Sequence, residues 1–477
     1  MEGLRRIFAV EPEEVRDDAS AALSRLHSDD LSRVIASIEE WPSFLPSCPI
    51  ARNQRMLEII LGHGLSLRFK SLSPLLIGSF VLFGSLVLSG CIQAEMGDDP
   101  GRVDSIQYER SLLLEETSET SANVSIGDVT GNGHLDIILV KGRHWPLANL
   151  VLEGDGEGTF VPARPLGGPA DRSYSGVLVD MTGNGALDVV VSNDSPDGKV
   201  VYFNDGEGNF SVGSSFGRPE WPTRHVHVAD LNGNGHPDIV VANRYGAREG
   251  FNYVCVNEGG GHFDGDCRAF SGESATSIAV ADFQGNGSLD LLVPHRDGGQ
   301  SYIYLNDGAA HFPERIPFGP ADASIRSAIA VDLDGDGILD VVAIDQERGP
   351  LIFMGQPELT FAPGVPPGSG LATPYADATP YALGVHDLNQ NGRPDVIVGF
   401  VSAPSVAYLN AGDGRTFTEV PFGDGEGTVY GFSFGDVDAD GFVDIAVARS
   451  GAPNVLFFGG PTTAGTPINP QEGLSTP

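Results

Sequence analysis

Short apolar runs alternate with turns rich in Gly and Asp over most of the chain after residue 104. An apolar run such as 328–331 precedes an acidic segment, and a β-branched run such as 341–342 follows it. Further on, a third strand-like run ends near Asn and leads into a Gly turn and a Phe, as at 200–210 and 302–312. Runs of this length separated by tight turns predict four short antiparallel strands in each unit.

The acidic segments share a nine-residue motif, D-x-[TNQD]-x-[ND]-G-x-x-D, which recurs seven times. The copies are spaced 49 to 55 residues apart and begin at Asp128, Asp180, Asp230, Asp282, Asp332, Asp387 and Asp436. A four-stranded sheet repeated radially is the blade of a β-propeller. The pattern therefore predicts an all-β chain folded as a seven-bladed β-propeller with four strands in each blade.

The two ends of the repeat array complement each other. The last copy supplies only three strands, the third at 454–458, whereas residues 105–114 form a surplus strand before the first motif. We expect this N-terminal strand to complete the last blade, because a closed ring leaves no long exposed sheet edge. The propeller is then one domain, residues 104–460, followed by a disordered tail at 461–477.

This motif resembles the FG-GAP/VCBS repeats found in the N-terminal propeller of integrin α subunits and in some fungal propeller lectins. The resemblance covers about 355 residues and is specific for fold rather than activity, because one fold hosts many functions. Proteins of this family carry calcium in the hairpin between the first two strands of a blade. The resemblance therefore implies that the seven acidic motifs are calcium loops.

The chemistry of the motif agrees with calcium, which takes six to eight oxygen ligands. Positions 1, 3, 5 and 9 would supply side-chain oxygen and position 7 its backbone carbonyl. The predicted metal residues are Asp128, Thr130, Asn132, His134 and Asp136; Asp180, Thr182, Asn184, Ala186 and Asp188; Asp230, Asn232, Asn234, His236 and Asp238; Asp282, Gln284, Asn286, Ser288 and Asp290; Asp332, Asp334, Asp336, Ile338 and Asp340; Asp387, Asn389, Asn391, Arg393 and Asp395; and Asp436, Asp438, Asp440, Phe442 and Asp444.

Charge ranks these loops. The fifth and seventh place four carboxylates each and are expected to bind most tightly, whereas the fourth, with the longer Gln284 at position 3, is expected to bind most weakly. The alternative is an Asx-rich hairpin turn that holds no metal, since Asp and Asn side chains cap turns unaided.

The overall charge of the chain narrows the classes of partner that it can bind. The chain has 64 acidic and 28 basic side chains, a formal net charge of −36, which argues against nucleic acid as a partner. Of the acidic side chains, 18 belong to the seven motifs. We therefore expect these 18 carboxylates to serve as metal ligands.

Residues 71–90 are twenty residues without a charge that lead into Leu88-Ser89-Gly90-Cys91. This ending resembles a bacterial lipobox, which implies that Cys91 is lipidated after removal of a signal at 56–91. We expect an exported, lipid-anchored protein of the bacterial envelope, on the outer membrane if the source is Gram-negative, with a tether at 92–103. An uncleaved transmembrane anchor is the alternative, and residues 1–55 are either a cytoplasmic extension or the product of a misassigned start. In an oxidising compartment Cys255 and Cys267, which flank one Gly turn, are expected to form a disulfide.

The first strand of each propeller blade lines the central channel. By symmetry, residues six positions before each motif meet at the mouth opposite the calcium loops; these include Tyr174, Arg224, Arg326, Tyr381 and Tyr430. Residues five positions after each motif, where the second strand ends, include Asn193, Asn243 and His295, and the basic residues Arg143, His144, Arg244 and Arg296 lie nearby in the sequence. Arg and aromatic side chains are typical interface anchors, so this face is predicted to recognise an acidic or sugar-like ligand. The alternative is a set of solvated loop tips and aromatics that cap the channel.

We find no HExxH, GxSxG, P-loop or Rossmann motif, and the sequence favours a non-enzymatic recognition or adhesion module for a glycan or protein ligand. Two alternatives remain open at this point: an extracytoplasmic carbohydrate-active enzyme of lyase or dehydratase type on the same propeller, and an envelope assembly scaffold.

Overall fold

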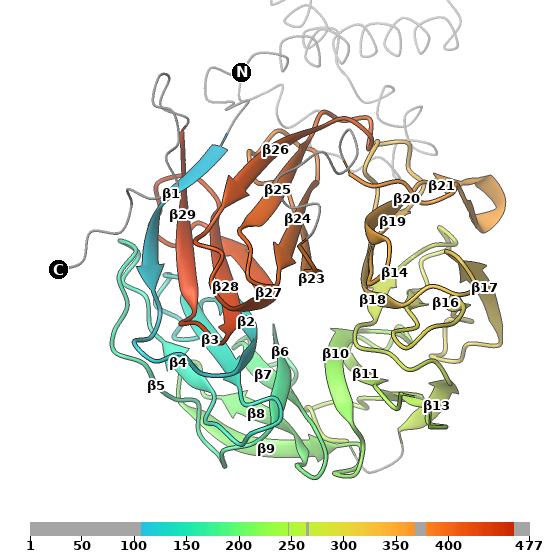
Figure 1. The fold of residues 1–477 in the computed structure, drawn as a ribbon. Coiled ribbons are helices and arrows are strands. Elements are labelled where there is room, and N and C mark those ends of the chain that lie inside the picture. The colour runs from blue at the N-terminus through green and yellow to red at the C-terminus, as the bar shows by residue number, and fades with distance from the viewer. Residues whose placement is uncertain (1–105, 247, 264–266, 368–377, 462–477) are drawn as a thin grey trace, which may run out of the picture. The chain divides into compact units, whose positions relative to one another are not determined.

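The computed structural model describes residues 106–246, 248–263, 267–367 and 378–461. These residues form seven antiparallel blades arranged around a common centre (Figure 1), so the predicted seven-bladed propeller is confirmed. The innermost strand of each blade neighbours the innermost strand of the next, all the way round the ring. Within the described residues the only helical element is a single 3-10 turn, η2 (Pro357–Leu359).

The blades follow each other in chain order. Blades 1 to 3 contain β2 (Ser121–Gly127), β3 (Asp136–Lys141), β4 (Leu150–Leu152) and β5 (Arg164–Pro165); β6 (Ser173–Val179), β7 (Asp188–Asn193), β8 (Lys199–Asn204) and β9 (Phe210–Phe216); and β10 (Thr223–Ala229), β11 (Asp238–Asn243), β12 (Asn252–Cys255) and β13 (Arg268–Ser271). Blades 4 and 5 contain β14 (Ala279–Ala281), β15 (Asp290–Val293), β16 (Ser301–Leu305) and β17 (Glu314–Phe318); and β18 (Ile325–Val331), β19 (Asp340–Asp345) and β20 (Gly349–Phe353). Blades 6 and 7 contain β23 (Pro380–His386), β24 (Asp395–Phe400), β25 (Ser405–Asn410) and β26 (Phe417–Phe422); and β27 (Thr428–Gly435), β28 (Asp444–Ser450), β29 (Val455–Pro461) and β1 (Ile106–Leu113).

The core lies between the blades. Every residue of the second strand in each blade is buried, because neighbouring blades cover both faces of the sheet. Val140 of blade 1 and Val191 of blade 2 belong to one such interface cluster, and both are fully buried. This explains why these strands are continuous apolar runs and do not alternate between apolar and polar residues.

The ring closes through the strand before the first motif, as predicted. β1 pairs antiparallel with β29, with Leu112 opposite Leu456, and so completes blade 7. The side chain of Glu115, just beyond β1, accepts hydrogen bonds from Lys141 in blade 1 and from Asn454 in blade 7. The N-terminal segment therefore joins the first and last blades.

Blade 5 departs from the four-stranded pattern in the described residues. Its sheet has three strands, and the following segment forms a separate hairpin of β21 (Gly355–Gln356) and β22 (Thr360–Phe361). A single bridge between Ile352 and Val365 takes the place of the fourth strand. In this copy the segment after the third strand reads MGQPELTF (354–361) and lacks the Gly-rich turn found at 204–210 in blade 2.

Cys255, at the end of β12, and Cys267, just before β13, form a disulfide in blade 3. The extension at 1–55, the signal with Cys91, the tether and residues 462–477 of the tail lie outside the described residues. Within the described part, no helix is long and apolar enough to cross a membrane.

Candidate functional site

The acidic motifs form the turns between the first and second strands of each blade. In loop five, Asp332 accepts hydrogen bonds from the backbone N–H of Gly335 (2.7 Å) and of Gly337 (2.9 Å). Gly337 has a φ of +83°, a conformation that Gly adopts without steric cost. Asp336 then accepts the N–H of Ile338 at 2.8 Å. Equivalent bonds from the Gly at position 6 and the residue at position 7 recur in all seven loops.

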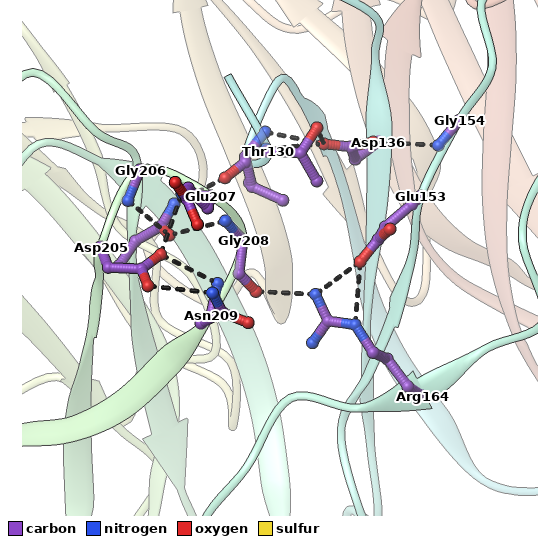
Figure 2. Close-up of polar contacts among 12 residues, drawn as sticks. Thr130, Asp136, Glu153, Gly154, Arg164, Asp205, Gly206, Glu207, Gly208 and Asn209 are labelled. Carbon is purple, nitrogen blue, oxygen red and sulfur yellow. Dashed lines mark hydrogen bonds and ion pairs between the residues drawn. The ribbon is translucent and has the colours of Figure 1, made fainter. Parts of the chain in front are cut away.

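The last Asp of each motif is buried and ties the loop to the sheet. Figure 2 shows Asp136 between Thr130, whose N–H it accepts at 3.0 Å, and Gly154, whose N–H it accepts at 2.9 Å. All seven closing carboxylates accept one N–H from position 2 of their own loop, which is Val129 in loop one, and one from a residue in or just after the third strand. They are structural residues whether or not a metal is bound.

Burial raises the pKa of most of these closing carboxyls. Desolvation is the largest cause, opposed in part by the backbone N–H donors, and it raises the pKa of Asp238 and Asp395 to about 6 and of Asp444 to about 7. A nearby cation stabilises a buried carboxylate in its charged form. These buried carboxyl groups are therefore of the kind that a bound metal ion would stabilise in the charged form.

Two loops bring three carboxylates together. Asp332, Asp334 and Asp340 each offer an oxygen within 4.8 Å of the others, as do Asp436, Asp438 and Asp444. In loop seven, Asp438 Oδ1 is buried and has no hydrogen-bond partner among the described residues. An oxygen-only donor set with an unsatisfied acceptor fits a hard cation such as Ca²⁺.

The remaining loops differ at position 3. Asn389 Oδ1 in loop six is likewise buried without a partner in the described part of the chain. In loops one and four, Thr130 and Gln284 instead donate hydrogen bonds to their closing carboxylates, Asp136 and Asp290. The position-3 side chain is thus turned toward its own loop in loops one and four.

At the opposite mouth of the channel the structure contains a cavity of about 300 Å³. All seven residues six positions before the motifs line it: Ala122, Tyr174, Arg224, Thr276, Arg326, Tyr381 and Tyr430. They meet because all seven inner strands start at this mouth and end at the acidic loops.

Arginines stack on tyrosines around this cavity. The guanidinium carbon of Arg224 lies 4.3 Å from the ring centroid of Tyr174, and that of Arg326 lies 3.3 Å from the ring of Tyr381. The hydroxyls of Tyr381 and Tyr430 are 2.9 Å apart. Burial raises the pKa of Tyr430; burial acts the same way on Tyr381, but Arg326 and the hydrogen bond to Tyr430 lower the pKa of that phenol overall. These contacts fix the orientation of the side chains that line the cavity.

Three residues that line the cavity lie in turns after the second strands, and the spacing of the motif does not predict where these turns place them. Arg143 and His144 follow the second strand of blade 1, and Arg244 follows that of blade 3; all three line the cavity. The sequence feature that points to these three residues is that basic residues recur directly after the second strands. His225, on β10, also lines the cavity.

Asn193, Asn243 and His295 lie elsewhere than expected. None of the three lines the channel cavity. Asn193 and Asn243 are fully buried and donate hydrogen bonds to the carbonyl oxygens of Gly198 and Phe251. They hold the loops after their strands, so their polar side chains face inward to backbone and not outward to a ligand.

Comparison with known proteins places the chain in a family. The FG-GAP-like repeat model matches residues 128–191, 180–241, 230–293, 294–343 and 387–447, more than half of the sequence. The chain therefore belongs to the FG-GAP-like repeat family.

The chain is also similar to human integrin alpha-IIb, with 30% identity over 162 residues. The match covers 28% of this chain and 15% of the integrin. Among solved structures, BBS1N in complex with ARL6DN, soaked with mercury, aligns with a TM-score of 0.52 and 11% identity over 74% of this chain and 96% of that one. The same complex soaked with lead gives a TM-score of 0.51 and 12% identity over the same shares. At such identities these structures show the fold alone.

Proposed function

We propose that this protein is an exported recognition or adhesion module that binds a glycan or protein ligand at the mouth of its central channel. The observation that carries the proposal is the cavity formed by the first-strand residues of all seven blades. A concave site lined by convergent polar groups is the usual form of a ligand site. Arg and Tyr, which dominate this one, are typical anchors of recognition surfaces.

Calcium is the proposed cofactor, in up to seven loops and most tightly in loops five and seven. The support is the set of grouped carboxylates together with the unsatisfied oxygen of Asp438. A bound cation would offset the repulsion among these carboxylates and hold the turn at the end of the inner strand. Its role is to rigidify the ring that positions the distant cavity.

The proposed location is the bacterial envelope, with a lipid anchor at Cys91. The sequence of the apolar segment supports this, and a disulfide between Cys255 and Cys267 is typical of proteins in oxidising compartments.

Ligand screening tests the recognition function. The full chain, in calcium, is screened on a glycan array and against isolated envelope proteins, beside the double variant Tyr174→Ala with Arg224→Ala. We expect the double variant to lose the ligands that the natural chain binds, whereas Arg415→Ala, an exposed residue on the far side of the ring, keeps them. Equal binding by all three proteins would show that the cavity is not the recognition site.

A further inference from the structure

The channel cavity carries more positive charge than its own carboxylates balance. Arg224 pairs with Asp194 at 2.5 Å, and Arg244 pairs with Asp297 at 2.6 Å. In the described residues, no carboxylate forms an ion pair with the other two arginines that line the cavity, Arg143 and Arg326. Both are therefore uncompensated in a protein whose net charge is −36.

The two uncompensated guanidinium groups face the same phenol. Arg143 lies 3.9 Å and Arg326 lies 5.8 Å from the ring centroid of Tyr430. Two cations held on one ring repel each other unless an anion joins them. Arg296, buried just behind, adds a third positive group; burial, with Arg326 and Arg244 nearby, lowers its pKa to about 10.

Several polar atoms of the cavity wall lack partners. Arg143 Nε, His225 Nδ1 and Ser277 Oγ are shielded from solvent and make no hydrogen bond within the described part of the chain. Arg143 also has a φ of +53°, an uncommon conformation for a residue with a side chain. Unsatisfied buried groups and backbone strain are features that cluster at binding sites.

The rest of the wall is rich in hydroxyl groups. Besides the arginines, the cavity is lined by Tyr174, Ser175, Thr276, Ser327, Tyr381 and Tyr430. A hydroxyl both donates and accepts hydrogen bonds, which suits a ligand that carries hydroxyls of its own. Trp145, two residues beyond Arg143 and 68% exposed, offers an aromatic face in the same turn.

We infer that the channel cavity binds an acidic sugar residue of the uronate class, with its carboxylate between Arg143 and Arg326 and its hydroxyls on the tyrosine and serine side chains. This inference rests on the proposed recognition function and names the ligand class for that site. The volume of about 300 Å³ is at the small end of ligand pockets, which suits a terminal sugar ring. The density of hydroxyl groups favours a sugar over an acidic peptide.

The test compares three small probes by calorimetry on the full chain in calcium: methyl β-glucuronide, methyl β-glucoside and N-acetylglutamate amide. The glucuronide is expected to bind at least about tenfold more tightly than the glucoside, because charge-assisted hydrogen bonds to Arg are the strong ones. Its affinity should fall with added salt. Arg143→Gln should remove about a factor of ten for the glucuronide and leave the glucoside unchanged, whereas Arg415→Gln should change neither.

Each outcome decides the inference. Equal affinity for glucuronide and glucoside would overturn the acidic class but leave sugar recognition standing. Binding of the glutamate derivative alone would overturn the sugar class and leave a protein ligand. No binding of any probe would overturn the inference, while the array screen separately judges the wider function. If Arg143→Gln does not fold, Tyr174→Phe, which keeps the ring and removes only the hydroxyl, is expected to weaken the glucuronide severalfold.

Discussion

The side-chain amide of Asn204, at the end of β8 in blade 2, donates a 2.8 Å hydrogen bond to the carbonyl oxygen of Val129 in the first acidic loop of blade 1. The backbone N–H of the same Asn204 donates to Asp188, the closing carboxylate of its own blade. Asn306 and Asn410 make the same contact to Leu231 and Leu333. Four of the acidic loops are thus held by an asparagine of the following blade, the fourth being Asn257 on Met181.

Replacing this asparagine should destabilise the contact between blades. Asn204→Ala is expected to lower the free energy of unfolding by about 1–3 kcal/mol, because it leaves the buried carbonyl of Val129 without its donor. Urea denaturation in calcium measures the change. Asn209→Ala, in the exposed turn that follows, is the matched control; a loss of the same size there would contradict the interblade role.

Calcium removal should weaken the whole ring. With calcium at a hundred times its dissociation constant, a single site contributes about 2.7 kcal/mol to stability, so excess chelator should sharply lower the thermal midpoint. Asp334→Asn should reduce the number or affinity of bound ions measured by calorimetry, because one of the three grouped carboxylates of loop five is neutralised. Asp307→Asn, an exposed carboxylate outside the loops, should bind as the natural chain does. An unchanged thermal midpoint in chelator would contradict the metal proposal.

The junction of the first and last blades depends on a buried ion pair. Lys141 is 1% exposed and pairs with Glu115, whose other oxygen accepts the side chain of Asn454. Glu115→Gln should cost about 3 kcal/mol in the free energy of unfolding, since removing one partner leaves a buried charge poorly compensated. Glu119, the second partner of Lys141, still compensates the lysine charge in the variant, so the loss should not exceed about 3 kcal/mol. Glu116→Gln, exposed and adjacent, should have little effect, and equal losses would argue against the junction.

A buried histidine in the channel wall should make the protein less stable in mild acid than a chain that lacks this histidine. Burial, with His227 close by, lowers the pKa of His225 to about 3, below its ordinary value of 6.5. As pH falls through 6.5, the unfolded chain takes up a proton that the folded chain excludes, so the free energy of unfolding falls by at most about 1.4 kcal/mol per pH unit. Urea unfolding at pH 7.5 and 5.5 should show that the free energy of unfolding falls more, or rises less, on acidification in the natural chain than in His225→Gln, because the raised pKa values of Asp238, Asp395 and Asp444 act in the opposite direction in both proteins. His311→Gln, an exposed histidine, should leave the difference unchanged; no change in His225→Gln would refute the assignment.

The blades and the cavity positions were predictable to different degrees. The motif marks the same point in every blade, so counting six residues back reaches Tyr174, Arg224 and the five equivalent residues that share the cavity. Counting five residues forward did not reach residues that line the cavity. In blades 2 and 3 this position is a buried asparagine, and Asn193 donates its side-chain amide to the carbonyl oxygen of Gly198 in the next turn.

The positions that the repeat motif did not predict lie in turns whose length varies between blades. The turns after the second strands differ from blade to blade, so nothing in the period puts Arg143 on the ring of Tyr430. The bridge that replaces a fourth strand in blade 5 likewise depends on local packing and not on the shared motif.

The pairing of β1 with β29 sets the order in which this protein can mature. These two strands are the first and last of the described chain, so β1 emerges from the ribosome early and waits for its partner until almost all of the propeller has been made. During that interval it is an unpaired strand edge, which is open to misassembly. Ring closure is therefore a late and vulnerable step in biosynthesis, and a factor that shields β1 until β29 arrives should increase the yield of folded protein.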